Sequence, residues 1–412
     1  MHTRDFFSGI ERIIGESNFA FCCRVLICIL RIPFSEFADK LTLVVAEIFF
    51  ENGCYPAALR YAESVRGPRY LEDAVYLSSW IRYKSDGFAK GWPRYPGGLF
   101  DPKGLEYDQP NAATVYIENA NKPDELIRCL GFRPWTPTVT SPKPIFIWYD
   151  CASSLGGETL ATLLLLRFKR QFQVKLILVA DPRLLEVVRT NFPLDEVYAK
   201  GKNLAEFRQR CDNYLLARDV LMYVIQSESD FAELQKETLK LAGSPNQLAS
   251  SHRPQVAFSW KTTNLKQGFY RNLPIKKLAK LFAKFDCDYH SAQHAVKTES
   301  ITLLKGILGD RIHFDTIHPS GTAEDIARAL AAMDLVITID NSVLHIAGAF
   351  GVPTIALLSV PAYWAWPMEG KSSRFYHSVQ LIHQKKPREW DDVLAELTPI
   401  LAQLRVRQRP IR

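Results

Sequence analysis

The sequence lacks the short motifs that identify several large enzyme classes. It contains no G-x-x-x-x-G-K-[ST], no H-E-x-x-H and no G-x-S-x-G, so the NTPase, zinc-protease and α/β-hydrolase interpretations have no motif to support them. No G-x-G-x-x-G follows a predicted strand, which argues against an epimerase that binds a dinucleotide. Function therefore has to be inferred from where polar residues interrupt strands and helices.

The cysteines are not arranged to bind a metal. The eight cysteines form no C-x-x-C pair, and no histidine stands beside them at the spacing of metal ligands. In a chain of 412 residues this usage predicts free thiols in a reducing compartment.

No apolar run is long enough to span a bilayer. The most hydrophobic stretch, residues 19–32, is short and contains Arg24 and Arg31. Acidic residues among the first 18 positions argue against a signal peptide. We expect a cytoplasmic protein whose membrane contact is at most peripheral, at the inner face.

Charge of one sign is not concentrated anywhere in the chain. The formal net charge of +7 is spread without a long block of lysine and arginine, so we expect no nucleic-acid partner and only a weak preference for anionic substrates. Hydrophobic and charged contents of 47% and 23% are those of a globular protein, and the length predicts two or three domains.

Residues 1–95 are predicted to form a helical region. Residues 34–50 carry apolar side chains at helical spacing, and residues 53–62 place small and large apolar residues as in a tetratricopeptide helix pair. A weaker echo at residues 87–92 lies close to that repeat's period. We predict a helical cap or a module that docks a protein partner, with an ordinary helical domain as the alternative. Residues 96–140 are rich in turn-forming residues and predict an irregular linker.

The rest of the chain alternates strands and helices and predicts two α/β domains, residues 141–245 and 250–412. In the first, strands are expected at 145–149, 174–179, 196–199 and 220–224, with a glycine-bearing loop at 151–158. In the second, strands are expected at 255–260, 289–293 and 312–315, with a basic loop at 261–272. Two doubly wound sheets in tandem leave a cleft between the carboxyl ends of their strands.

Residues 334–359 predict a compact strand–turn–helix–strand unit late in the second domain. The expected strands are 334–340 and 354–359, and the expected helix is 343–350. Asp340, Asn341 and Ser342 form the turn, where helix N–H groups suit a phosphate. The alternatives are structural: Asp340 caps the helix, and His345 is a buried histidine bonded to a backbone carbonyl.

The same residues resemble a known family. Residues 334–349, DLVITIDNSVLHIAGA, are similar to the signature of glycosyltransferase family 9, the ADP-heptose heptosyltransferases. Other stretches resemble the branch of this family that carries N-terminal tetratricopeptide-like helices. These are residues 259–263 through Arg271, residues 291–293 and residues 364–366. The match covers about residues 145 to 400. It implies a GT-B fold, a nucleotide-sugar donor such as ADP-heptose on the second α/β domain, a bacterial glycan, lipid-linked or protein acceptor on the first, and no cofactor.

The resemblance also implies which residues bind the substrates. The implied donor contacts are Thr262, Thr263, Lys266, Arg271, Gln293, Asp340, Asn341, Ser342, Val343 and His345. Weaker acceptor-side candidates are Gly156, Gly157, Trp364 and Trp366, the tryptophans either stacking on a sugar or packing in the core.

Glu158 is the candidate catalytic base. The family's first-domain glycine loop carries an aspartate, and Glu158 stands at that position if Gly157 is an insertion. Its alternative is a solvated carboxylate in the first turn of a helix. Because Gly157 departs from the family's loop pattern, the alternative function is a catalytically inactive scaffold that binds a partner through its helical region. A D-x-D triplet, Asp286 to Asp288, lies before a strand, away from the expected donor edge, and is set aside as a metal site.

Overall fold

The structure is a computed structural model that describes residues 34–86, 131–138, 141–149, 155–200, 205–248, 251–262, 268, 270–363 and 365–404. The chain divides into two compact units, residues 1–97 and 98–412, which are described separately. Of the predicted features, Thr263, Lys266, Trp364, the apolar stretch 19–32 and the repeat echo 87–92 lie outside the described residues.

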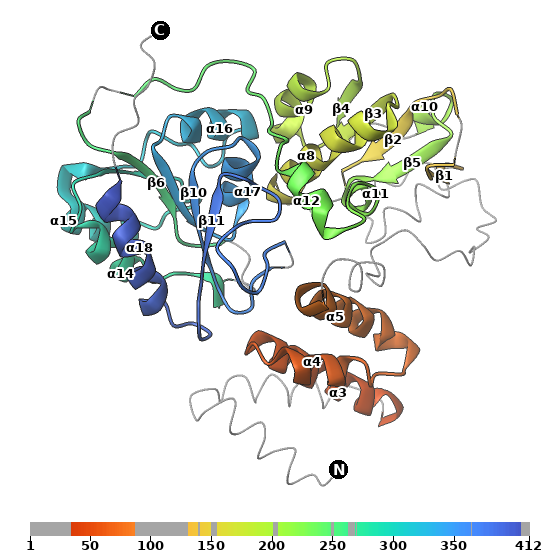
Figure 1. Ribbon diagram of the computed structural model, residues 1–412, viewed down its shortest axis with the longest axis horizontal. Coiled ribbons are helices and arrows are strands. Elements are labelled where there is room, and N and C mark those ends of the chain that lie inside the picture. Colours follow the sequence, from red (N-terminus) through yellow and green to blue (C-terminus); the bar gives the residue numbers. More distant parts are fainter. Residues whose placement is uncertain are drawn as a thin grey trace. The chain divides into compact units, whose positions relative to one another are not determined.

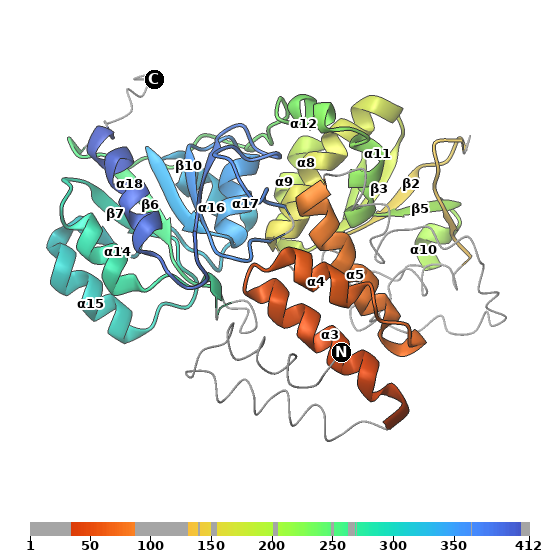
Figure 2. The same cartoon turned by 60° about the horizontal axis from the view of Figure 1, so that its bottom comes forward.

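The first unit contains packed helices. They are α3 (Phe34–Glu51), α4 (Tyr55–Ala62) and α5 (Pro68–Asp86), seen side by side in Figure 2. Alanines at 46, 58, 62 and 74 are buried among larger apolar side chains, which lets the helices approach closely. Asp39 of α3 accepts hydrogen bonds from the backbone N–H groups of Arg66 and Gly67 and so fixes the turn before α5. These contacts explain the helical fold; a tetratricopeptide-like module stays a prediction.

The first sheet of the second unit is parallel, with strand order β1-β5-β2-β3-β4. Its strands are β1 (Arg133–Pro134), β2 (Ile145–Trp148), β3 (Leu176–Ala180), β4 (Glu196–Ala199) and β5 (Asn213–Leu216). Its helices are α8 (Leu155–Phe172), α9 (Leu185–Asn191), α10 (Ala205–Arg208), α11 (Val220–Val224) and α12 (Glu228–Leu234), with 3₁₀ turns η4 (Pro182–Leu184) and η5 (Ala217–Asp219). The chain reverses direction across the sheet between β2 and β5, which is its topological switch point.

Two predictions for this sheet are wrong. Residues 220–224 form the helix α11, and the strand lies earlier, at β5. A five-residue apolar run cannot be assigned by periodicity alone, and β5 is selected because it pairs with β2 at Phe146 and Tyr214. The glycine-bearing loop is also shorter than expected, since α8 already begins at Leu155. Gly156, Gly157 and Glu158 therefore belong to its first turn.

The second sheet is parallel and has the order β11-β10-β9-β6-β7-β8, the order typical of dinucleotide-binding α/β domains. Its strands are β6 (Gln255–Ser259), β7 (Asp288–Ser291), β8 (Ile312–His313), β9 (Leu335–Ile339), β10 (Thr354–Leu358) and β11 (Val379–His383). Its helices are α14 (Ile275–Phe282), α15 (Thr298–Leu308), α16 (Ala323–Ala331), α17 (Ser342–Ala349) and α18 (Asp391–Gln403), with the 3₁₀ turn η6 (Gly309–Arg311). Figure 1 shows α14, α15 and α18 on one side of this sheet and α16 and α17 on the other. Its switch point lies between β6 and β9.

The predicted strand–turn–helix–strand unit is confirmed as β9, α17 and β10. Every residue of both strands is buried, as expected for strands covered on both faces. Gly351, at φ +69°, follows the end of α17 in the left-handed conformation that glycine favours. Thr322 and Asp325 form a capping box at the start of α16. Among the described residues, none of the helices is long and apolar enough to cross a bilayer.

Candidate functional site

The turn after β9 is held by the side chain of Asn341. Its Oδ1 caps α17 by accepting from the N–H of Val343 at 3.0 Å, and its Nδ2 donates to Ser259 Oγ at 2.7 Å. Ser259 and Thr338 Oγ1 are 2.7 Å apart, so the ends of β6 and β9 are tied together at the switch point. The cap is therefore Asn341, not Asp340. Its side chain accepts from the N–H of Val343, one of the helix N–H groups that the sequence analysis expected to bind a phosphate. Ser342 begins the helix and is half-buried.

Asp340 and Arg271, two predicted donor contacts, form a buried ion pair. Arg271 Nη1 lies 3.0 Å from Asp340 Oδ2, and the two side chains are 7% and 5% exposed. The guanidinium also lies over the ring of Tyr363, 5.3 Å from its centroid. Among the described residues, Arg271 Nε has no hydrogen-bond partner, whereas Asp340 Oδ2 is the oxygen that Nη1 contacts.

His345 faces the same ion pair from the second turn of α17. Its Nδ1 is 2.9 Å from the Tyr376 hydroxyl, and its Nε2 is 3.9 Å from Asp340 Oδ1. Burial lowers the pKa of His345 to about 4, and the nearby Asp340 opposes that shift. The ring is therefore neutral at pH 7. The structural alternative of a bond to a backbone carbonyl is wrong, because the partner is a tyrosine hydroxyl.

Gln293 shapes the start of the basic loop that follows β6. Its Oε1 accepts from the N–H groups of Trp260 and Lys261, and its Nε2 donates to the carbonyls of Lys261 and His294. The N–H of Thr262 donates to Asn272 Oδ1 at 2.8 Å, which closes the loop from its other end. Gln293 thus fixes the backbone of Lys261 rather than offering free amide groups to a ligand.

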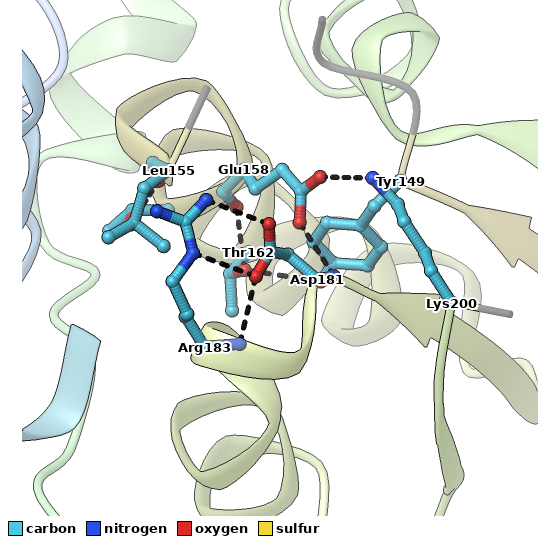
Figure 3. A network of polar contacts seen from close by, with 8 residues as sticks. Tyr149, Leu155, Glu158, Thr162, Asp181, Arg183 and Lys200 are labelled. Atoms are coloured by element: carbon cyan, nitrogen blue, oxygen red, sulfur yellow. Dashed lines mark hydrogen bonds and ion pairs between the residues drawn. The ribbon is translucent and has the colours of Figure 1, made fainter. Parts of the chain in front are cut away.

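Glu158 lies in a network of charges at the carboxyl ends of β3 and β4 (Figure 3). Its Oε1 is 2.5 Å from Lys200 Nζ, and its Oε2 accepts from the N–H of Asp181 at 3.0 Å. Asp181 in turn pairs with Arg183 at 2.9 Å. Burial raises the pKa of Glu158, and Lys200 opposes the rise. Because the carboxylate is 1% exposed, the alternative of a solvated first-turn carboxylate is wrong.

The first turn of α8 touches α17. A Cβ on Gly156 would lie 2.9 Å from His345 Cδ2 and 3.0 Å from Ser342 Cα, so only glycine allows this approach. Each helix follows a strand at the switch point of its own sheet. The contact therefore brings the carboxyl ends of both sheets to one place, as expected for a ligand site.

Trp366 and the D-x-D triplet at residues 286–288 are both held by contacts within the protein. The ring of Trp366 is fully buried and lies 5.3 Å from His345 and 6.2 Å from Tyr376, so it has no open face for a sugar. Asp286 and Asp288 lie at the amino end of β7 and both pair with Arg253. Among the described residues, no group of histidine, cysteine or acidic side chains is placed to hold a metal ion.

Sequence reasoning missed Lys200, Asp181 and Tyr376. Lys200 and Asp181 each follow a strand directly, so a systematic search of strand ends could have found them. Tyr376 lies before β11, an unpredicted strand, and no local pattern indicates it.

No protein-family model and no curated protein matches the sequence. Among solved structures, the chain is similar to the E. coli ADP-heptose LPS heptosyltransferase II, with 14% identity, a TM-score of 0.42, and coverage of 63% of this chain and 99% of that chain. It is also similar to a glycosyl transferase family 9 protein from Veillonella parvula, with 11% identity, a TM-score of 0.41, and coverage of 66% and 98%. An E. coli heptosyltransferase with ADP gives 10% identity, a TM-score of 0.37, and coverage of 63% and 99%. At TM-scores this low, these likenesses assign neither a family nor an activity to the chain.

Proposed function

We propose that this chain is a glycosyltransferase of the GT-B type, which moves a sugar from a nucleotide sugar to an acceptor hydroxyl. The observation that carries the proposal is the contact of Gly156 with Ser342 and His345, which joins the switch points of the two sheets. Ligands of open α/β sheets bind at such points. A donor on the second sheet and an acceptor on the first can therefore meet there.

The donor side is the turn after β9 together with the loop after β6. Asp340 and His345 are proposed to offer polar groups to the sugar, and Arg271 supplies a cation 3.0 Å from Asp340. Thr262, Thr263 and Lys266 are proposed to contact the diphosphate. Cations on this loop can neutralise the leaving diphosphate directly, so we expect transfer to proceed without a divalent metal. The sequence resemblance favours ADP-heptose as donor.

The acceptor side is the first turn of α8. Glu158 is the proposed base for the acceptor hydroxyl, a role typically worth about 10²- to 10⁴-fold in rate. A bacterial glycan, free, lipid-linked or attached to protein, is the proposed acceptor, met in the cytoplasm or at the inner face of the membrane.

The test begins with the donor. A panel of nucleotide sugars is screened by thermal shift, where a ligand at 100 times its Kd adds about 2.7 kcal/mol. The best donor is then assayed for hydrolysis and for transfer to acceptor extracts, with EDTA in a parallel arm. We expect Asp340→Asn to weaken donor binding, Glu158→Gln to slow transfer, and the exposed control Glu233→Gln to change neither. A wild-type protein that binds no nucleotide sugar refutes the proposal.

A second candidate function follows from the state of Glu158. Both of its oxygens are engaged inside the protein, one by Lys200 and one by the Asp181 N–H. A chain in which this carboxylate only joins α8 to the strand ends would be an inactive scaffold, with the helical region as its partner-binding module. Donor binding without turnover, with any acceptor extract, favours this candidate.

A further inference from the structure

Tyr376 is buried next to His345, one of the proposed donor contacts. Its hydroxyl lies 2.9 Å from His345 Nδ1, and its side chain is 2% exposed. A Cβ on Gly348 would lie 2.6 Å from Tyr376 Cγ, so α17 carries glycine where the tyrosine ring packs against it. Gly348 comes three residues after His345, on the same face of the helix.

The imidazole of His345 is enclosed on several sides. The Trp366 ring lies 5.3 Å away at an interplanar angle of 31°, and Gly156 packs against the ring edge at Cδ2. Asp340 Oδ1 faces Nε2 at 3.9 Å. The chemistry of the enclosed ring depends on which nitrogen carries the proton.

Two tautomers are possible, and the surroundings favour one. If Nδ1 carried the proton, the lone pair of Nε2 would face the Asp340 carboxylate, which is repulsive. If Nε2 carries it, the N–H points toward Asp340 and Nδ1 is free to accept from the phenol. Burial keeps the pKa of Tyr376 well above its usual value, so the phenol retains a proton to donate.

We infer that Tyr376 is a positioning residue: its hydroxyl donates to Nδ1 and holds His345 in the tautomer that carries its proton on Nε2. The separation of 3.9 Å between Nε2 and Asp340 Oδ1 is too long for a hydrogen bond. One hydroxyl oxygen between them can accept from the N–H and donate to the carboxylate. His345 and Asp340 thereby recognise a sugar hydroxyl of the donor together, a role that rests on the proposed function.

The test reads the tautomer directly. Long-range ¹⁵N–¹H spectra of the full chain, labelled on its histidines, distinguish protonated from unprotonated ring nitrogens, and His345→Gln identifies the signals. We expect Nε2 to be the protonated nitrogen in the wild type. Tyr376→Phe should shift the Nδ1 resonance and weaken ADP-heptose binding about five- to tenfold.

Tyr289→Phe is the matched control. Tyr289 is also fully buried, and its hydroxyl donates to the carbonyl of Phe282 at 2.9 Å in the core of the second sheet. Tyr289→Phe also removes a hydrogen bond donated by a buried phenol, but it should leave the His345 signals and the affinity for ADP-heptose unchanged. A protonated Nδ1 in the wild type, or equal effects of the two substitutions, overturns the inference. If the wild type binds no ADP-heptose, the donor proposal fails, and the tautomer result alone decides the role of Tyr376.

Discussion

Replacing Lys200 with methionine tests the charge network around Glu158. Lys200 Nζ lies 2.5 Å from Glu158 Oε1, and the two side chains are 17% and 1% exposed. Nζ also lies 5.9 Å from the centroid of the Trp148 ring. Methionine keeps most of the aliphatic stem and removes the charge, so the substitution leaves a buried carboxylate without its cation.

The expected loss of stability is large. Removing one partner of a buried ion pair costs about 3–5 kcal/mol because the other charge stays buried. Glu158 retains the hydrogen bond from the Asp181 N–H, and we therefore expect the lower end, about 3 kcal/mol at pH 7.5.

The loss should depend on pH with a definite sign. Burial raises the pKa of Glu158 and Lys200 opposes the rise, so the substitution raises the pKa further. A carboxyl whose pKa is higher in the folded than in the unfolded chain loses stability as pH rises from about 4.3, the unfolded value, through the folded pKa. The difference between variant and wild type should therefore be small near pH 4.5 and grow toward pH 8.

Urea unfolding of both proteins at a series of pH values measures this difference. Lys236→Met is the control, because Lys236 pairs with Glu233 at the surface, where such pairs contribute little. A loss for Lys200→Met that is the same at every pH would show that packing, rather than the buried charge, causes it.

Three further predictions concern the second sheet and α8. Arg271→Gln leaves Asp340 buried without its cation and should cost about 3–5 kcal/mol in urea unfolding and weaken nucleotide binding, whereas a loss below 1 kcal/mol contradicts a buried pair. Gly156→Ala should lower the free energy of unfolding by about 1–3 kcal/mol, because the added Cβ would meet His345 and Ser342. Its control is Gly306→Ala, where a Cβ has nothing within 4 Å and should stabilise α15 by up to about 1 kcal/mol. Equal melting temperatures of the two variants would contradict the close approach of α8 to α17. The pKa of His345 is lowered from 6.5 to about 4, so its burial should reduce stability by about 3 kcal/mol as pH falls through that window, and His345→Gln should flatten that slope.

In the second sheet, the unit of β9, α17 and β10 could be predicted well because its signals are local. Buried parallel strands give continuous apolar runs, and the polar residues 340–342 indicate by their type the turn that precedes α17. The turn at Asp340 was found because strand, cap and helix follow one another within a few residues.

The missed features depend on contacts between distant residues. β5 and α11 both read as short apolar runs, and only pairing with β2 decides between them. Glu158 and Lys200 are 42 positions apart, and His345 and Tyr376 are 31 apart. Sequence spacing does not indicate which residues form such pairs, because the fold of each sheet brings the partners together.

The charge network does not by itself exclude Glu158 as a base. A carboxylate has about four lone-pair positions, and Lys200 and the Asp181 N–H use two of them. Access is the harder requirement, since the side chain is 1% exposed. The two roles separate when stability and turnover are compared across variants. For a base, Glu158→Gln slows transfer by about 10²- to 10⁴-fold, and Lys200→Met slows it less, at a pH that keeps both variants folded. For a structural link between α8 and the strand ends, both variants lose stability together, and donor binding persists in each while the folded fraction allows it.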